Sequence, residues 1–252
     1  MIALSLAPNF RDVGALPVMG GRTLRPGMLY RSEAVLDPTP DDAVKIRGCG
    51  IRMVFDLRSG VEALRAPNEF WEQEGIEHCN LDLLSGFPRD HNPWAVLRDD
   101  PSRAGGAALM HALYAGMPRA ALSHLPRLFD AAALGKVPLL VHCTAGKDRT
   151  GFMIAMLLAA LGVEAAAIEA DYMASAGRKT AVAREATRHM ARSYVGGEIG
   201  DDAIEEIMGV KPSYLAASFA AIEADFGGID AYLARVGLDP ARRSAFQAKL
   251  IA

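Results

Sequence analysis

Cys143 and Arg149 are the two residues of this chain whose types and spacing point most directly to chemistry. A cysteine thiolate is a strong nucleophile, and the planar guanidinium of arginine can bind two oxygens of one phosphoryl group. Thr150 follows the arginine and can donate a hydrogen bond to the sulfur when it leaves. The pattern therefore predicts in-line attack of Cys143 on phosphorus, with Arg149 holding two equatorial oxygens, and a phosphocysteine that water then hydrolyses.

The segments on either side must position these residues. Leu139 to Val141 form an apolar run after Gly135 and Pro138, which predicts a buried strand, and Phe152 to Leu161 predict a buried helix. A strand that passes into a helix leaves backbone N–H groups without partners, and the helix dipole adds positive charge. We expect the residues between them to form an anion cup that also favours the thiolate.

The composition of the cup suits phosphate. Gly146 permits an unusual φ, and His142 can orient the loop through its ring nitrogens. Because the cup supplies positive charge, the reaction is expected to need no metal and no cofactor. The alternative is an ordinary buried cysteine beside a solvated turn, but the flanking strand and helix favour the cup. The residues expected to bind phosphate or substrate here are His142, Thr144, Ala145, Gly146 and Lys147.

Composition limits the function classes. The chain has 252 residues, of which 51% are hydrophobic and 23% charged, as in an ordinary globular protein. A net charge of −3 gives no basic field for nucleic acid. Three cysteines indicate a reducing compartment rather than a disulfide framework. No apolar run approaches the ~20 residues of a membrane span, so no stable membrane insertion is expected. The N-terminus lacks a basic region, and we expect a cytoplasmic protein, or one secreted without a signal peptide.

Strands and helices alternate through the first half of the chain, and helices follow. Strands are predicted within 28–32, 51–56 and 76–84, and a hairpin turn at Gly20-Gly21. Helices are predicted from Thr39, over 62–73 with a break at Pro67, and over 107–115, 118–134, 163–175, 212–226, 229–236 and 240–251. This order predicts a single α/β domain over residues 1–252: a central, mostly parallel sheet flanked by helices, with a helical C-terminal layer.

Two segments have the character of lids. Residues 85–101 are polar and rich in proline, and residues 179–194 form a basic amphipathic helix. We expect lid elements around 85–117 and 178–211. The basic helix could instead be a solvated face or a surface that meets anionic lipid.

Polar residues at strand ends are further candidates. Asp56 and Arg58 lie where ligands bind in α/β folds, although they could instead cap a turn. Asp82 lies near the end of the next predicted strand, and Arg58 and Asp82 are expected to bind substrate. Arg11, Asp12 and Arg31 are expected by themselves to belong to a surface ion-pair set.

Taken together, the chain resembles the bacterial tyrosine/serine protein phosphatases, an atypical branch of the cysteine phosphatases. The resemblance runs nearly end to end, and rests on the segments Asn9–Gly14, Tyr30–Ser32, Asp56–Ser59 with Glu62, His142–Gly151 and Asp225–Leu233. It implies a cysteine-phosphatase-like fold and activity on phosphotyrosine, with phosphoserine, phosphothreonine or phosphoinositides as further substrates. The partner would thus be a phosphoprotein or a phosphoinositide.

The resemblance leaves two roles open. The Trp-Pro-Asp pattern that carries the general acid in typical tyrosine phosphatases is absent. Asp148 within the cup is favoured as the acid, then Asp82, with Asp90 as a third candidate. Lys147 is similar to lysines in loops that handle phosphoinositides, and could meet a second phosphate or act as a rim charge that speeds association.

Two other functions compete with hydrolysis. One is a phosphate-binding module that has lost catalysis, although nucleophile, arginine and hydroxyl are all present. The other is a sulfur-transfer or arsenate-reducing enzyme, for which Cys49 and Cys79 lie in no recognisable redox motif. The sequence predicts neither the physiological substrate nor the oligomeric state.

Overall fold

A five-stranded sheet forms the centre of the computed structural model, which describes residues 2–87, 92–178 and 181–252. The strand order is β1 (Arg11–Asp12), β4 (Leu29–Glu33), β7 (Leu139–Cys143), β5 (Met53–Asp56) and β6 (Glu77–Asn80). Strands β4, β7, β5 and β6 run parallel, and β1 pairs antiparallel with β4. The expected mostly parallel sheet is confirmed. The predicted hairpin is also present, with β2 (Pro17–Val18) and β3 (Arg22–Thr23) joined by Met19, Gly20 and Gly21.

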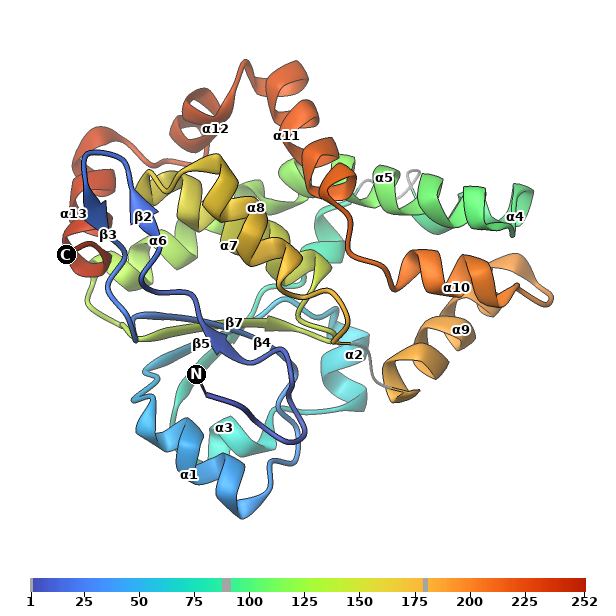
Figure 1. Ribbon diagram of the computed structural model, residues 1–252, viewed down its shortest axis with the longest axis horizontal. Coiled ribbons are helices and arrows are strands. Elements are labelled where there is room, and N and C mark those ends of the chain that lie inside the picture. Colours follow the sequence, from blue (N-terminus) through green and yellow to red (C-terminus); the bar gives the residue numbers. More distant parts are fainter. Residues whose placement is uncertain (1, 88–91, 179–180) are drawn as a thin grey trace.

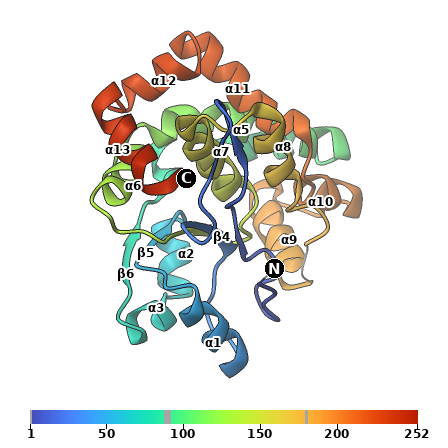
Figure 2. The same ribbon diagram turned by 60° about the vertical axis from the view of Figure 1, so that its left-hand side comes forward.

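Helices cover both faces of the sheet (Figure 1, and turned in Figure 2). Along β7 the side chains alternate, as the pleat requires: Leu139, Val141 and Cys143 pack into the larger helical layer, and Leu140 into the smaller core with α1 and α3. The helices are α1 (Pro40–Gly48), α2 (Gly60–Arg65), α3 (Glu69–Gln73), α4 (Val96–Asp99), α5 (Arg103–Ala120), α6 (Leu125–Ala133), α7 (Asp148–Leu161), α8 (Ala165–Met173), α9 (Ala181–Val195), α10 (Asp201–Ile207), α11 (Pro212–Phe226), α12 (Ile229–Arg235) and α13 (Pro240–Leu250).

The expected break between two helices before β7 lies in a different place. The sequence pattern predicts a new helix that begins at Pro118, but α5 continues through this residue to Ala120. A proline inside a helix frees the carbonyl four residues earlier. That carbonyl, of Tyr114, accepts a hydrogen bond of 2.7 Å from Ser218 Oγ in α11. The chain therefore does not need to end the helix there, and the break follows at residues 121–124.

The two predicted lid segments contact each other. Trp94 stacks on Tyr194 of α9 with ring centroids 5.5 Å apart. The sequence predicts an irregular segment over residues 93–99, but these residues form a short 3₁₀ turn and α4. The pattern also gives no sign of α10. Three arginines of α9 pair with acidic residues of α10 or the segment before it, so these charges meet protein carboxylates. The pairs are Arg184 with Asp201 and Glu205, Arg188 with Asp201, and Arg192 with Glu198.

Within the described ranges, no helix has both the length and the apolar character that crossing a membrane requires.

Candidate active site

The loop between β7 and α7 forms a cup around the sulfur of Cys143. The strand ends at Cys143, which is 2% exposed, and α7 begins at Asp148. The backbone N–H of Gly146 donates to Cys143 Sγ at 3.3 Å. Gly146 has φ +66°, and a Cβ there would lie 2.4 Å from the backbone N of Glu33. The unusual φ expected for this glycine is confirmed, and no larger residue fits the loop.

The loop is held from behind by the N-terminal segment and β4. Asn9 Nδ2 donates to the carbonyls of Ala145 (3.2 Å) and Gly146 (2.8 Å), and Arg31 Nη2 donates to Gly146 O at 3.0 Å. Because a peptide's C=O and N–H point in opposite directions, holding these carbonyls outside directs the following amides toward the cup. Asn9 and Arg31 thus orient the groups that would bind an anion.

Arg11 and Arg31 share one buried carboxylate. Asp171 of α8 accepts from Arg11 Nε at 3.2 Å and from Arg31 Nη1 at 2.5 Å. Burial opposes ionisation of Asp171, but the two guanidinium groups outweigh it and hold its pKa below the usual value. The expectation of a surface ion-pair set is wrong for these arginines, since Arg31 is 0% exposed. They belong to the support of the cup.

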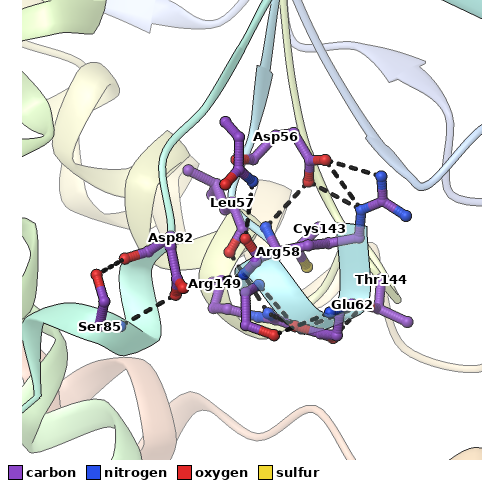
Figure 3. A network of polar contacts seen from close by, with 12 residues as sticks. Asp56, Leu57, Arg58, Glu62, Asp82, Ser85, Cys143, Thr144 and Arg149 are labelled. Atoms are coloured by element: carbon purple, nitrogen blue, oxygen red, sulfur yellow. Dashed lines mark hydrogen bonds and ion pairs between the residues drawn. The ribbon is translucent and has the colours of Figure 1, made fainter. Parts of the chain in front are cut away.

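Glu62 holds the guanidinium of Arg149. Its carboxylate accepts from Arg149 Nη1 at 2.6 Å and Nη2 at 2.9 Å, and from Thr144 Oγ1 at 2.5 Å (Figure 3). Burial would raise the pKa of Glu62, but these donors lower it to about 2. No described residue accepts from Arg149 Nε. The Nε edge is therefore the part of the guanidinium left to bind a phosphoryl oxygen.

Local sequence places Glu62 for this task. Ser59 begins α2 with a capping box, in which its hydroxyl accepts from the N–H of Glu62 and its own N–H donates to Glu62 Oε2 at 2.8 Å. The cap fixes the glutamate on the first turn of α2, close to the end of β5. Arg149 also approaches this region, since Nη1 lies 3.4 Å from Leu57 O.

Asp148 lies between a lysine and a tyrosine. Lys147 Nζ donates to both carboxylate oxygens, at 2.7 and 2.6 Å, and Tyr114 Oη donates to Oδ1 at 2.8 Å. Lys147 also donates to the carbonyls of Ile207 (3.0 Å) and Gly209 (3.3 Å) at the end of α10. These four acceptors take up the three N–H donors of the ammonium. In this arrangement Lys147 joins the cup to α10.

Thr150 and His142 are both fully buried. Thr150 Oγ1 has no hydrogen-bond partner among the described residues. His142 Nδ1 lies 3.4 Å from the carbonyl of Cys143 and 3.8 Å from Asp56 Oδ1. Burial lowers the pKa of His142 to about 4, so the imidazole is neutral near pH 7. Its contact with the Cys143 carbonyl places it at the start of the loop.

Arg58 and Asp82 have other partners. Arg58 is 2% exposed and donates to Asp56, Asn68 and the carbonyl of Ala66, so its guanidinium lies in the framework. Asp82 caps two backbone N–H groups, of Gly60 and of Ser85, both at 3.0 Å (Figure 3). Asp82 therefore serves as a turn cap in this structure. Asp90 lies outside the described residues.

Sequence reasoning assigned no role to several residues of the site. Glu62 and Asn9 entered only through the family resemblance, although the Ser59–Glu62 capping-box pattern could have located the glutamate. Asp171 and Tyr114 gave no signal, because their partners come from elements far away in the chain.

A cysteine at the base of a loop of amides, between a parallel strand and a buried helix, is typical of a cysteine-phosphatase-like fold. The model of the tyrosine phosphatase family matches residues 2–252. The chain therefore belongs to the tyrosine phosphatase family, and it is a protein-tyrosine-phosphatase enzyme.

Three relatives are similar over most of this chain. A Cupriavidus necator protein, provisionally named a tyrosine-protein phosphatase, is 34% identical over 92% of this chain and 82% of its own. The triple specificity protein phosphatase PtpB of Mycobacterium tuberculosis is 29% identical over 92% of both. A tyrosine-protein phosphatase of Nostoc commune is 24% identical over 79% of this chain and 66% of its own.

Proposed function

We propose that this enzyme hydrolyses phosphotyrosine through a phosphocysteine on Cys143. The observation that carries the proposal is the contact of 3.3 Å between Gly146 N–H and Cys143 Sγ, beneath a loop whose carbonyls are held outward. The thiolate attacks phosphorus in line, and the bond from phosphorus to the tyrosyl oxygen breaks. The phosphoryl oxygens bind the loop amides and the Nε edge of Arg149.

Asp148 is the general acid of this proposal. It gives its proton to the leaving tyrosyl oxygen, and then accepts a proton from the water that attacks the phosphocysteine. That second attack breaks the S–P bond, releases inorganic phosphate and regenerates the thiolate. Thr150, with a buried hydroxyl that no described residue binds, donates to the sulfur as it leaves.

In this proposal the substrate range extends from phosphotyrosine to phosphoserine, phosphothreonine and phosphoinositides. The name of the M. tuberculosis relative, triple specificity protein phosphatase, supports a range of more than one substrate class. Two roles were considered for Lys147: binding a second phosphate, and speeding association as a rim charge. The contacts of its ammonium group with Asp148 and α10 favour neither of them. The whole chain acts as one domain. Within the expected lid segments 85–117 and 178–211, α4 and α9 act as lid elements, whereas Tyr114 of α5 and Ile204 of α10 are buried in the core.

A substrate panel without added metal or thiol tests the proposal. Phosphotyrosine peptide, phosphoserine peptide and a phosphoinositide are each incubated with wild type and with Cys143→Ser, and phosphate release is measured. We expect wild-type turnover of phosphotyrosine and none by Cys143→Ser. A wild-type protein that binds phosphopeptide without releasing phosphate would instead be a silent binding module. Activity that appears only with a sulfur donor or with arsenate and thiol would indicate the other cysteine-loop chemistry.

A further inference from the structure

A buried pair of hydrogen-bonded tyrosines lies beside Asp148, and one of them, Tyr114, donates to its carboxylate. Tyr114 of α5 is 0% exposed, and its hydroxyl lies 2.8 Å from Asp148 Oδ1 and 2.8 Å from the hydroxyl of Tyr172 in α8. The two rings meet edge to face, with centroids 6.0 Å apart. Nothing in the hydrolytic steps above uses either tyrosine.

The position of the Tyr114 hydroxyl is set by elements that pack tightly. The backbone carbonyl of Tyr114 accepts from Ser218 of α11, and its ring lies 5.9 Å from that of Tyr214. Gly151 of α7 lies against Tyr172, because a Cβ at this glycine would come within 2.8 Å of the tyrosine ring. Both hydroxyls are therefore held in place by packing rather than by solvent.

The hydrogen-bond chain adapts to both forms of the carboxylate. An ionised carboxylate only accepts, so Tyr114 donates to Asp148 and Tyr172 donates to Tyr114. When Asp148 carries a proton, it can donate to Tyr114, whose hydroxyl then turns toward Tyr172. The two phenols thus stay neutral while their protons reorient. Burial raises the pKa of both, which keeps them protonated throughout.

We propose that Tyr114, backed by Tyr172, is the positioning residue that aims the carboxyl group of Asp148 at the leaving oxygen. This inference rests on the proposed function of Asp148 as general acid. Lys147 contacts both carboxylate oxygens as well, but it also binds the end of α10, whereas the tyrosine pair joins the carboxyl group to the buried core.

Leaving-group dependence tests the proposal. Phosphotyrosine releases a phenol with a pKa of about 10, which needs a proton, whereas p-nitrophenolate is a much better leaving group. We expect Tyr114→Phe to lower kcat on a phosphotyrosine peptide about tenfold, as for a lost hydrogen bond to a charged group, with KM within about twofold. The loss on p-nitrophenyl phosphate should be clearly smaller.

Tyr232→Phe is the matched control. Tyr232 is also 0% exposed, and its hydroxyl donates to Pro118 O of the same helix, α5, at 2.8 Å. Removing this hydroxyl should leave unchanged the ratio of kcat on the phosphotyrosine peptide to kcat on p-nitrophenyl phosphate. Tyr172→Phe keeps the contact of Tyr114 with Asp148 and should give a smaller loss with the same substrate dependence. This variant maintains the test if Tyr114→Phe does not fold.

A double variant separates positioning from general loosening of the fold. If Tyr114 acts through Asp148, adding Tyr114→Phe to Asp148→Asn should change kcat by less than about twofold. Equal losses on both substrates, or an undiminished loss in the Asp148→Asn background, would overturn the inference. If Asp148→Asn lowered kcat while Tyr114→Phe kept the wild-type kcat, the role of Tyr114 would be contradicted and the role of Asp148 would stand. Full phosphotyrosine turnover by Asp148→Asn would remove the acid assignment itself.

Discussion

Glu62 binds both terminal nitrogens of Arg149, at 2.6 and 2.9 Å, and thereby sets which edge of the guanidinium faces the cup. The glutamate comes from the first turn of α2, and the arginine from the first turn of α7. Two helices that follow neighbouring strands of the sheet are thus joined at the site. The contact makes the orientation of Arg149 a property of the framework, present before substrate arrives.

Glu62→Gln should lower kcat/KM for phosphotyrosine about tenfold or more. The amide keeps the shape of the side chain but loses the charge and one of the acceptors that hold the guanidinium, so Arg149 must be ordered by the substrate instead. Steady-state kinetics measure the effect. Glu74→Gln is the matched control, because Glu74 also accepts two hydrogen bonds from one arginine, from Nε and Nη2 of Arg47, on the exposed surface. Equal kinetics for Glu62→Gln and wild type would show that Arg149 needs no such support.

Asn9→Ala should weaken both the cup and the fold. It removes the Asn9 donor from the carbonyl of Ala145 and one of two donors from that of Gly146, which keeps its bond from Arg31. Leaving the Ala145 carbonyl without this donor costs roughly 1–3 kcal/mol in the free energy of unfolding, and vanadate, a phosphate analogue, should bind less tightly. Urea unfolding and vanadate inhibition report the two effects. Replacing Asn92, which caps only an exposed turn, should leave vanadate binding unchanged. Wild-type vanadate affinity in Asn9→Ala would contradict the role given to Asn9.

Asp148→Asn should lower kcat for phosphotyrosine by about 100-fold or more, within the usual range for a lost general acid. The amide can still accept from Tyr114, so the change is mainly the loss of a transferable proton. The comparison of phosphotyrosine with p-nitrophenyl phosphate shows whether the loss follows the leaving group. Asp82→Asn serves as the comparison, since Asp82 caps backbone N–H groups in the structure. If Asp82→Asn lowered kcat and Asp148→Asn did not, Asp82 would be the general acid in place of Asp148.

His142 should make the protein less stable as the pH falls below neutral. Its pKa is about 4 in the folded protein, below the ordinary value of 6.5, because burial disfavours the charged ring. Between these values the unfolded chain binds the additional proton, so stability rises with pH there and is lost as the pH falls from about 6.5 toward 4. From pH 7.5 to 5, this group should remove about 2 kcal/mol of unfolding free energy.

Urea unfolding at pH 7.5 and at pH 5 measures this dependence. His142→Asn should show a correspondingly smaller difference between the two pH values, whatever its absolute stability. The same pH dependence in wild type and His142→Asn would rule out the neutral buried imidazole.

Local patterns were sufficient for the centre of the fold. The apolar runs that predict β7 and α7 are buried because both elements lie between helical layers, and no distant residue is needed to define them. The same holds for the C-terminal helices, where proline starts α11 and α13 and Gly227 ends α11. These signals act within one or two turns of the chain.

The features that the sequence patterns predicted wrongly depend on contacts between elements that are distant in the chain. Pro118 is tolerated inside α5 because Ser218, 104 residues after Tyr114, binds the freed carbonyl. Arg11 and Arg31 are buried rather than exposed because Asp171 reaches them from α8. Neither partner can be identified from local spacing, since the pairing exists only once the helices have packed.

Trapping the covalent intermediate tests the central claim most directly. Wild-type enzyme is mixed with a phosphotyrosine peptide, quenched with acid within the first turnover, digested and examined by mass spectrometry. The account predicts one phosphoryl group on the peptide that contains Cys143, and none in Cys143→Ser treated in the same way. Rapid phosphate release with Cys143 never phosphorylated, or turnover that survives in Cys143→Ser, would contradict it.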